Sequence, residues 1–222
     1  MPRVKICGLM DSSRARTAAR FGAGLLGLVF APSRRMVTLE QAQEISGAVM
    51  SLLDTAGARP LLVGVFVNQP QDEVNRAAEA CGLDYIQLSG DEVPDYCRGL
   101  DRPFIKALRL ATEDDAEDMM RLMDSYSAVN PDAIFLLDTH LPGVYGGSGR
   151  PWEWERAVRL ARFYPTIIAG GLTPENVAQA VREVTPWGVD VSSGVETDGV
   201  KDEAKIKAFI EAVRAVSLAR RC

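Results

Sequence analysis

Two side chains in this sequence are candidates for moving protons, Cys7 and Asp138. Each ends a short apolar run and is followed by a turn-forming or hydroxyl residue. Lys5 lies two residues before Cys7, so on a strand both side chains share one face. A nearby ammonium lowers the pKa of a thiol from about 8.5 toward neutrality, which makes thiolate available as a base. The alternatives are a small buried cysteine and a turn cap formed by Asp138 with Thr139.

Two glycine-containing turns could hold a phosphate group. Gly170-Gly171 follows one apolar run near the C-terminus, and Ser192-Ser193-Gly194 follows the next. Such turns expose backbone N–H groups, a short helical turn aims its positive end at an anion, and glycine lets the backbone come close. A single turn of this kind would be weak evidence for a phosphate site, because glycine after a strand is common and can mark no more than a tight turn. Two on neighbouring strands predict a phosphate site that includes Gly171, Ser192, Ser193 and Gly194.

Arg34 and Arg35 form the third group of interest. A guanidinium binds a carboxylate through two parallel hydrogen bonds, although both arginines could equally be solvated charges in a loop. His140 is the single histidine and is expected at the surface. With no second histidine and no HxH or HExxH spacing, we expect neither a metal site nor a cofactor.

Eight short apolar runs, rich in β-branched residues, alternate with longer amphipathic stretches along the whole chain. They predict strands over Arg3–Cys7, Leu25–Phe30, Leu61–Val67, Tyr85–Leu88, Phe104–Leu108, Ala133–Asp138, Thr166–Ala169 and Gly188–Ser192. Alternating strands and helices predict a parallel sheet covered by helices. Eight repeats, no strand-only hairpin and no GxGxxG after the first strand favour a closed (β/α)8 TIM barrel over an open doubly wound sheet.

Helix starts can also be predicted from capping residues. Asp11 or Ser12 can cap the first helix, and Thr38 with Gln41 has the spacing of a capping box. Asn68 can start the third helix, while Thr173-Pro174 places proline at the first position of the seventh. With no linker or change of composition, residues 1–222 are expected to form one catalytic barrel domain.

The composition limits the partners. The net charge is −5 and the isoelectric point is near 5.1, which argues against nucleic acid and anionic membranes as partners. The N-terminus has no signal-peptide pattern and no apolar run reaches membrane length. Four widely spaced cysteines are typical of free thiols in a cytoplasmic protein. We expect a small phosphorylated ligand and either a monomer or a homodimer.

In their order along the chain, the motifs resemble the phosphoribosylanthranilate isomerase family of tryptophan biosynthesis. The matching segments are Lys5-Ile6-Cys7-Gly8, Gly27-Leu28-Val29-Phe30, Ser33-Arg34-Arg35, Val63-Gly64-Val65-Phe66, Gln87-Leu88, Leu137-Asp138-Thr139, Gly146-Gly147-Ser148-Gly149, Ala169-Gly170-Gly171-Leu172, Asp190-Val191-Ser192-Ser193-Gly194-Val195-Glu196, Gly199 and Lys201-Asp202.

The resemblance implies an Amadori rearrangement of N-(5′-phosphoribosyl)anthranilate to the 1-deoxyribulose 5-phosphate amine. It implies that Asp138 protonates the ring oxygen and that Cys7 removes the C2′ proton. It implies that Arg35 holds the anthranilate carboxylate and that Gly171, Ser192, Ser193 and Gly194 hold the phosphate. The chemistry is consistent, because ring opening needs an acid, enamine formation needs a base, and neither needs a metal.

The sequence departs from the family at three positions, where Ser89 replaces histidine, Arg34 replaces proline and Arg150 replaces lysine. A related barrel isomerase of histidine biosynthesis would have aspartate in place of Cys7 and a second phosphate turn in mid-chain. A barrel that binds phosphorylated ligands without catalysis would lack a catalytic group. The motifs favour the phosphoribosylanthranilate isomerase over both alternatives.

Overall fold

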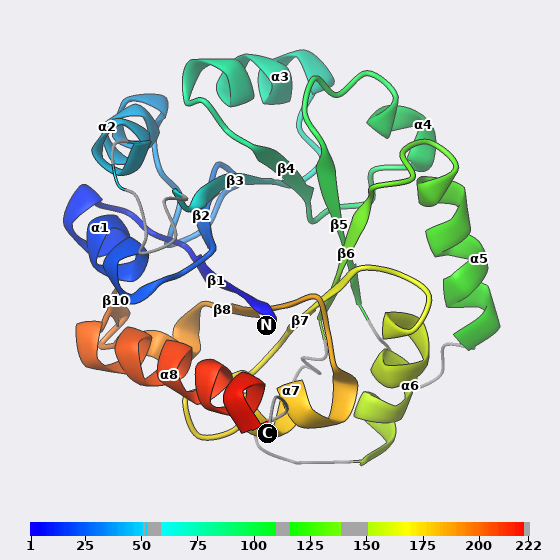
Figure 1. Ribbon diagram of the computed structural model, residues 1–222. Coiled ribbons are helices and arrows are strands. Elements are labelled where there is room, and N and C mark those ends of the chain that lie inside the picture. The colour runs from blue at the N-terminus through cyan, green and yellow to red at the C-terminus, as the bar shows by residue number, and fades with distance from the viewer. Residues whose placement is uncertain (51, 53–58, 110–115, 139–150, 220–222) are drawn as a thin grey trace.

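All eight predicted strands are present and form one closed parallel barrel. The computed structural model describes residues 1–50, 52, 59–109, 116–138 and 151–219. Each strand pairs with the next along the chain, and β8 pairs back onto β1 (Figure 1). The strands are β1 Arg3–Cys7, β2 Leu25–Val29, β3 Leu61–Phe66, β4 Tyr85–Leu88, β5 Phe104–Arg109, β6 Ile134–Asp138, β7 Thr166–Ala169 and β8 Gly188–Val191.

The strands separate two hydrophobic cores because successive side chains point to opposite faces. One set fills the inside of the barrel and consists of Leu25, Val63, Ile105, Ile134, Leu136, Ile167 and Ala169. The larger set points outward and packs under the helices, for example Leu26, Ile86 and Phe135. Burial on both faces explains why these strands are nearly continuous apolar runs in the sequence.

Helices surround the barrel as an outer ring (Figure 1). They are α1 Ser12–Phe21, α2 Leu39–Met50, α3 Gln71–Ala80, α4 Pro94–Cys97, α5 Ala116–Ser127, α6 Pro151–Ala161, α7 Val177–Val184 and α8 Glu203–Ala219. The Asp11 carboxylate caps α1 by accepting from the backbone N–H of Arg14 at 2.9 Å. The capping box before α2 is confirmed, since Thr38 and Gln41 bond to each other's backbone N–H.

Two helix starts differ from the prediction. Asn68 does not cap α3, because it adopts a left-handed conformation and its side chain accepts from Asp91 in the next loop. Helix α7 begins at Val177 rather than at Pro174. Thr173 and Asn176 first form a turn through their own side chains, in which Asn176 accepts from the Thr173 N–H at 2.8 Å.

A small hairpin follows β8, although the sequence was expected to contain none. A single 3-10 turn, η1 Ser193–Val195, leads into β9 Glu196–Thr197, which pairs antiparallel with β10 Val200–Lys201. Asp198 and Gly199 between them have positive φ angles of 52° and 79°, as a two-residue hairpin turn requires. The hairpin lies outside the barrel sheet, so barrel closure is unaffected.

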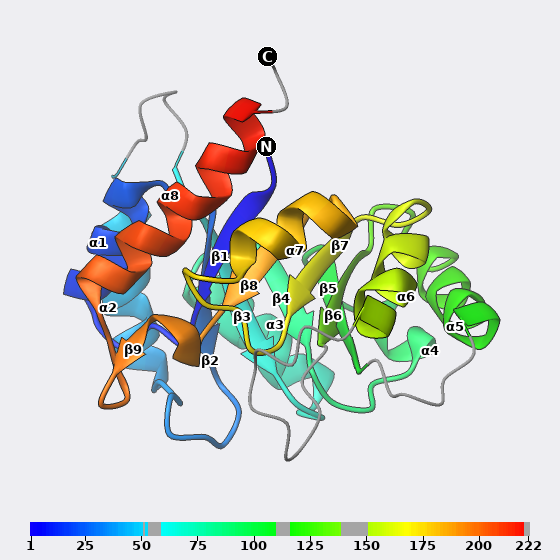
Figure 2. The same ribbon diagram turned by 90° about the horizontal axis from the view of Figure 1, so that it is seen from below.

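The strand ends and the hairpin lie on the same side of the barrel. In Figure 2 the N-terminus is at one end of the barrel, and β9 is at the other, beside the end of β2. Since parallel strands all run the same way, their carboxyl ends form one rim. The predicted chemistry-bearing residues therefore come from a single face of the molecule.

Candidate functional site

Lys5 and Asp190 form an ion pair inside the barrel. They occupy paired positions of β1 and β8, and Lys5 Nζ lies 2.9 Å from Asp190 Oδ1. Lys5 is fully buried. Burial lowers the pKa of Lys5, but the attraction of Asp190 and Cys7 outweighs it and raises that pKa to about 12. Lys5 is therefore a fixed positive charge beneath the thiol.

Cys7 lies at the end of β1 in a space that Gly27 provides. A Cβ at Gly27 would come within 2.9 Å of Cys7 Sγ and 3.2 Å of Lys5 Nζ. The expected fall in the pKa of Cys7 is wrong for this structure. Burial raises the pKa of the thiol above its ordinary value, and the attraction of Lys5 is too weak to reverse this. The reason is that Asp190 already neutralises much of that lysine's charge.

Asp138 ends β6 and is half-buried. It pairs in register with Arg109, the last residue of β5, so both side chains leave the rim on the same face. Arg109 was missed at the sequence level, because the strand was expected to end at Leu108. On the barrel circle β6 is three strands from β1. A small sugar derivative between the two strands can thus meet Asp138 on one side and Cys7 on the other.

The predicted phosphate turns pack directly against each other. Gly170 and Gly171 have φ angles of 92° and 63°, which side chains other than glycine rarely adopt. Ser193 and Gly194 form the short helical turn that was expected after β8. A Cβ at Gly194 would lie 1.9 Å from the carbonyl oxygen of Leu172. Glycine is therefore needed for the two loops to meet.

Ser192 connects this turn to the base of the site. Its hydroxyl donates to the backbone carbonyl of Cys7 at 3.2 Å. Its backbone carbonyl accepts from Lys201 Nζ at 3.0 Å. In this arrangement the side chain of Ser192 supports the strand end that carries Cys7.

Arg35 lies over the end of β1, on the Cys7 side of the rim. A Cβ at Gly8, where φ is 76°, would come within 2.3 Å of Arg35 Cδ. The guanidinium binds Glu196 through two hydrogen bonds, Nε to Oε1 at 2.7 Å and Nη2 to Oε2 at 2.9 Å. Arg34 donates to the same carboxylate at 2.8 Å but remains 60% exposed, against 20% for Arg35. Arg35 is the more enclosed of the two, and it bonds Glu196 through two nitrogens.

Glu196 and Lys201 are part of this site, and the sequence reasoning assigned them no role. They face each other across the β9–β10 hairpin, and Lys201 Nζ lies 2.8 Å from Glu196 Oε1. Burial opposes ionisation of Glu196, yet hydrogen bonds from Arg35 and Lys201 outweigh it and lower its pKa to about 2. The Asp198-Gly199 pair is a hairpin signal that could have located both residues.

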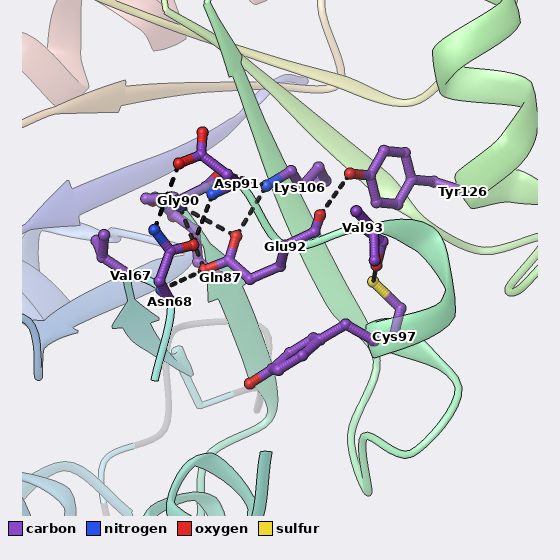
Figure 3. A network of polar contacts seen from close by, with 12 residues as sticks. Val67, Asn68, Gln87, Gly90, Asp91, Glu92, Val93, Cys97, Lys106 and Tyr126 are labelled. Atoms are coloured by element: carbon purple, nitrogen blue, oxygen red, sulfur yellow. Dashed lines mark hydrogen bonds and ion pairs between the residues drawn. The ribbon is translucent and has the colours of Figure 1, made fainter. Parts of the chain in front are cut away.

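Ser89, which stands where the family has histidine, bonds within the rim. It accepts from the Gln87 side-chain amide at 3.1 Å, so it fixes that amide and supplies no imidazole acid or base. The loop that follows is held by the buried carboxylate of Glu92, which accepts from Lys106 at 2.8 Å and from the backbone of Asn68 and Gly90 (Figure 3). This network supports the loops after β3 and β4.

Several predicted features lie outside the described residues. They are Thr139, His140, Gly146, Gly147, Ser148, Gly149 and Arg150. Within the described part of the chain, His, Cys, Asp and Glu side chains form no cluster of three that could hold a metal ion. No helix in that part is both long and apolar enough to cross a membrane.

Comparison with known proteins shows the family to which this chain belongs. The family model described as N-(5′phosphoribosyl)anthranilate (PRA) isomerase matches residues 4–212. The chain belongs to this family. A curated relative from Dehalococcoides mccartyi, named N-(5′-phosphoribosyl)anthranilate isomerase, is 44% identical over 223 residues and covers 100% of both chains.

Solved structures agree with this assignment. The phosphoribosyl anthranilate isomerase of Thermotoga maritima is 36% identical, with a TM-score of 0.80 over 97% of this chain and 100% of that one. A further structure of the enzyme, in complex with reduced 1-(o-carboxyphenylamino)-1-deoxyribulose 5-phosphate, is 34% identical with a TM-score of 0.77, and the same shares are covered. The fold and the family expected from the sequence are thereby confirmed.

Proposed function

We propose that the protein converts N-(5′-phosphoribosyl)anthranilate to 1-(2-carboxyphenylamino)-1-deoxyribulose 5-phosphate, a step of tryptophan biosynthesis, with Asp138 as acid and Cys7 as base. Family membership supports the reaction. One observation carries the residue assignment: Cys7 and Asp138 end strands β1 and β6 on the same rim of a closed barrel. Proton donor and acceptor can therefore act on one bound sugar.

The rearrangement takes place within one molecule. Asp138 donates a proton to the ring oxygen as the C1′–O bond breaks, and the anthranilate nitrogen forms a Schiff base with C1′. Cys7 then removes the proton from C2′ in its thiolate form, which burial disfavours and the neighbouring Lys5 favours, and the electron pair moves to give an enolamine. Tautomerisation moves the proton of the C2′ hydroxyl to C1′ and yields the aminoketose. The proton held by Cys7 returns through solvent to Asp138, so no atom is gained or lost and both groups are restored. Proton transfers of this kind call for no metal or redox cofactor.

The remaining contacts are assigned by the charge of the substrate. Arg35 binds the anthranilate carboxylate, because a planar guanidinium matches a carboxylate with two hydrogen bonds. Gly171, Ser192, Ser193 and Gly194 bind the phosphate through the backbone of the turns after β7 and β8. These contacts hold both ends of the substrate while its ribose carbons lie between Cys7 and Asp138.

The test of this function is a fluorescence assay on purified protein supplied with phosphoribosylanthranilate. Consumption of the substrate with formation of the aminoketose supports the assignment, and absence of turnover at any substrate concentration rejects it. The three described cysteines are free thiols, which fits work in the reducing cytoplasm. Sedimentation would decide between a monomer and a homodimer.

A further inference from the structure

We propose that Glu196 is a positioning residue that orients Arg35 for the substrate carboxylate and, through Lys201, ties that contact to the phosphate turn. This inference deepens the proposed function and rests on it. It concerns a carboxylate that touches no substrate atom itself and that joins two segments distant in sequence, the loop after β2 with Arg34 and Arg35 and the hairpin after β8 with Lys201. The hairpin after β8 brings these segments together.

The first observation is an excess of positive charge around Glu196. Arg34, Arg35 and Lys201 all donate to this one carboxylate, at 2.7–2.8 Å. Arg34 is 60% exposed to water, so Arg35 and Lys201 are the two enclosed cations beside one anion and leave a net charge of about +1, in a chain whose overall charge is −5. Partly buried cations without a matching anion are costly, so the cluster favours binding of a further negative group. A carboxylate of the substrate supplies that group.

The second observation is which edge of Arg35 is used. Glu196 engages Nε and Nη2, which form one edge of the guanidinium fork. A guanidinium has five donor hydrogens, so the edge formed by Nη1 and the second hydrogen of Nη2 points away from Glu196. A substrate carboxylate can bind that edge without displacing Glu196. The protein carboxylate therefore orients the fork while the ligand carboxylate binds its other side.

The third observation is a continuous chain of contacts to the phosphate turn. Lys201 Nζ contacts Glu196 Oε1 at 2.8 Å and the carbonyl oxygen of Ser192 at 3.0 Å. The hydroxyl of Ser192 then donates to the carbonyl of Cys7. Glu196 and Lys201 are both nearly buried, with side chains 5% and 3% exposed, so water competes little with these bonds. The two substrate-binding ends thus share one rigid support.

Two variants separate positioning from simple electrostatics. Glu196→Gln removes the negative charge, so electrostatic attraction alone predicts tighter binding of the anionic substrate and a lower KM. Loss of the oriented Arg35 predicts the opposite, a KM raised roughly 10–100-fold, which is the effect of losing charge-assisted hydrogen bonds. Glu196→Asp keeps the charge but is one methylene shorter. It should also raise KM if positioning is the cause.

The matched control is Glu92→Gln. Glu92 is another buried glutamate paired with a buried lysine, at 2.8 Å, but it lies on the β3–β5 side of the rim. It should lose stability while KM stays within about twofold of wild type. A merely structural role for Glu196 predicts the same behaviour as this control, a lower melting temperature with unchanged KM.

The decisive experiment measures KM, kcat and melting temperature for these variants, alone and combined with Arg35→Met. If Glu196 acts through Arg35, then Glu196→Gln adds little to KM once Arg35 is gone. A lower or unchanged KM in folded Glu196 variants, or an equally large effect in the Arg35→Met background, overturns the proposal.

The dissociation constant of the reduced product analogue gives the same comparison without turnover. Wild type that binds the analogue but does not turn over substrate would reject the proposed function and leave this test intact. Failure of wild type to bind the analogue would overturn both. A Glu196→Gln variant that does not fold leaves Glu196→Asp, which keeps the charge, to decide the outcome.

Discussion

Replacement of Gly194 by alanine tests the phosphate turn, and the structure sets the size of the effect. The added Cβ would lie 1.9 Å from the carbonyl oxygen of Leu172, whereas real Cβ atoms essentially never come within 3.0 Å of such an atom. The turns after β7 and β8 must therefore separate by at least about 1.1 Å. A misplacement of about 1 Å in a binding group costs roughly 10²-fold. We expect kcat/KM to fall by about that factor.

The assay is loss of substrate fluorescence over a range of phosphoribosylanthranilate concentrations, with inorganic phosphate as a competing ligand. The apparent inhibition constant of phosphate should rise in the variant, because the altered turn is the one that binds it. Gly47→Ala is the control, since nothing lies within 4 Å of a Cβ at this exposed position of α2. It should stabilise the protein by about 0.5–1 kcal/mol and leave kcat/KM unchanged.

One result would refute this reasoning. A folded Gly194→Ala protein whose kcat/KM stays within about threefold of wild type would mean that the turn does not bind the substrate phosphate. The same conclusion would follow if phosphate inhibited both proteins equally.

Three further predictions concern the charged residues. Arg35→Lys should raise KM about tenfold, since a point charge cannot replace the planar fork, while Arg34→Pro at a solvent-exposed position should change KM little. The reverse pattern in steady-state kinetics would move the role to Arg34. Lys5→Met should lower the free energy of unfolding in urea by about 3–5 kcal/mol, because it breaks a buried ion pair. It should also shift the acid limb of the kcat/KM pH profile to higher pH, because Lys5 lowers the pKa of the Cys7 base, and an unmoved limb would contradict this. Glu196, with its pKa lowered to about 2 from an ordinary value near 4.5, should contribute up to about 3 kcal/mol of stability that is present above pH 4.5 and lost as pH falls through 2. In urea unfolding, the Glu196→Gln variant should not show this pH-dependent loss of stability.

The barrel could be predicted from the sequence because burial on both faces of each strand leaves an unmistakable apolar pattern. The bounds of β1, β4 and β7 agree to the residue, and the other strands differ by one residue at one end. Helix starts were less predictable. Asn68 and Pro174 have the right residue types for a helix start, but competing side-chain bonds in the neighbouring turns delay the helices.

The Lys5–Asp190 pair could also be predicted, because alternation along a strand and closure of the barrel together fix which side chains meet. The contact of Arg35 with Glu196 could not be predicted, since 161 residues separate the two and the hairpin that carries Glu196 has strands of only two residues each. The predicted direction of the pKa shift of Cys7 was wrong for a related reason. The sequence shows the neighbouring ammonium but not the degree of burial or the carboxylate that neutralises it.

The most direct test of the central claim is turnover of phosphoribosylanthranilate by wild type and by the Cys7→Ala and Asp138→Ala variants in one assay. The account predicts conversion by wild type and a loss of kcat of about 10²–10⁴-fold in each variant, because each removes a positioned base or acid. Melting temperatures close to that of wild type would show that both variants remain folded. Either variant retaining near-normal kcat, or wild type without turnover, would contradict the assignment.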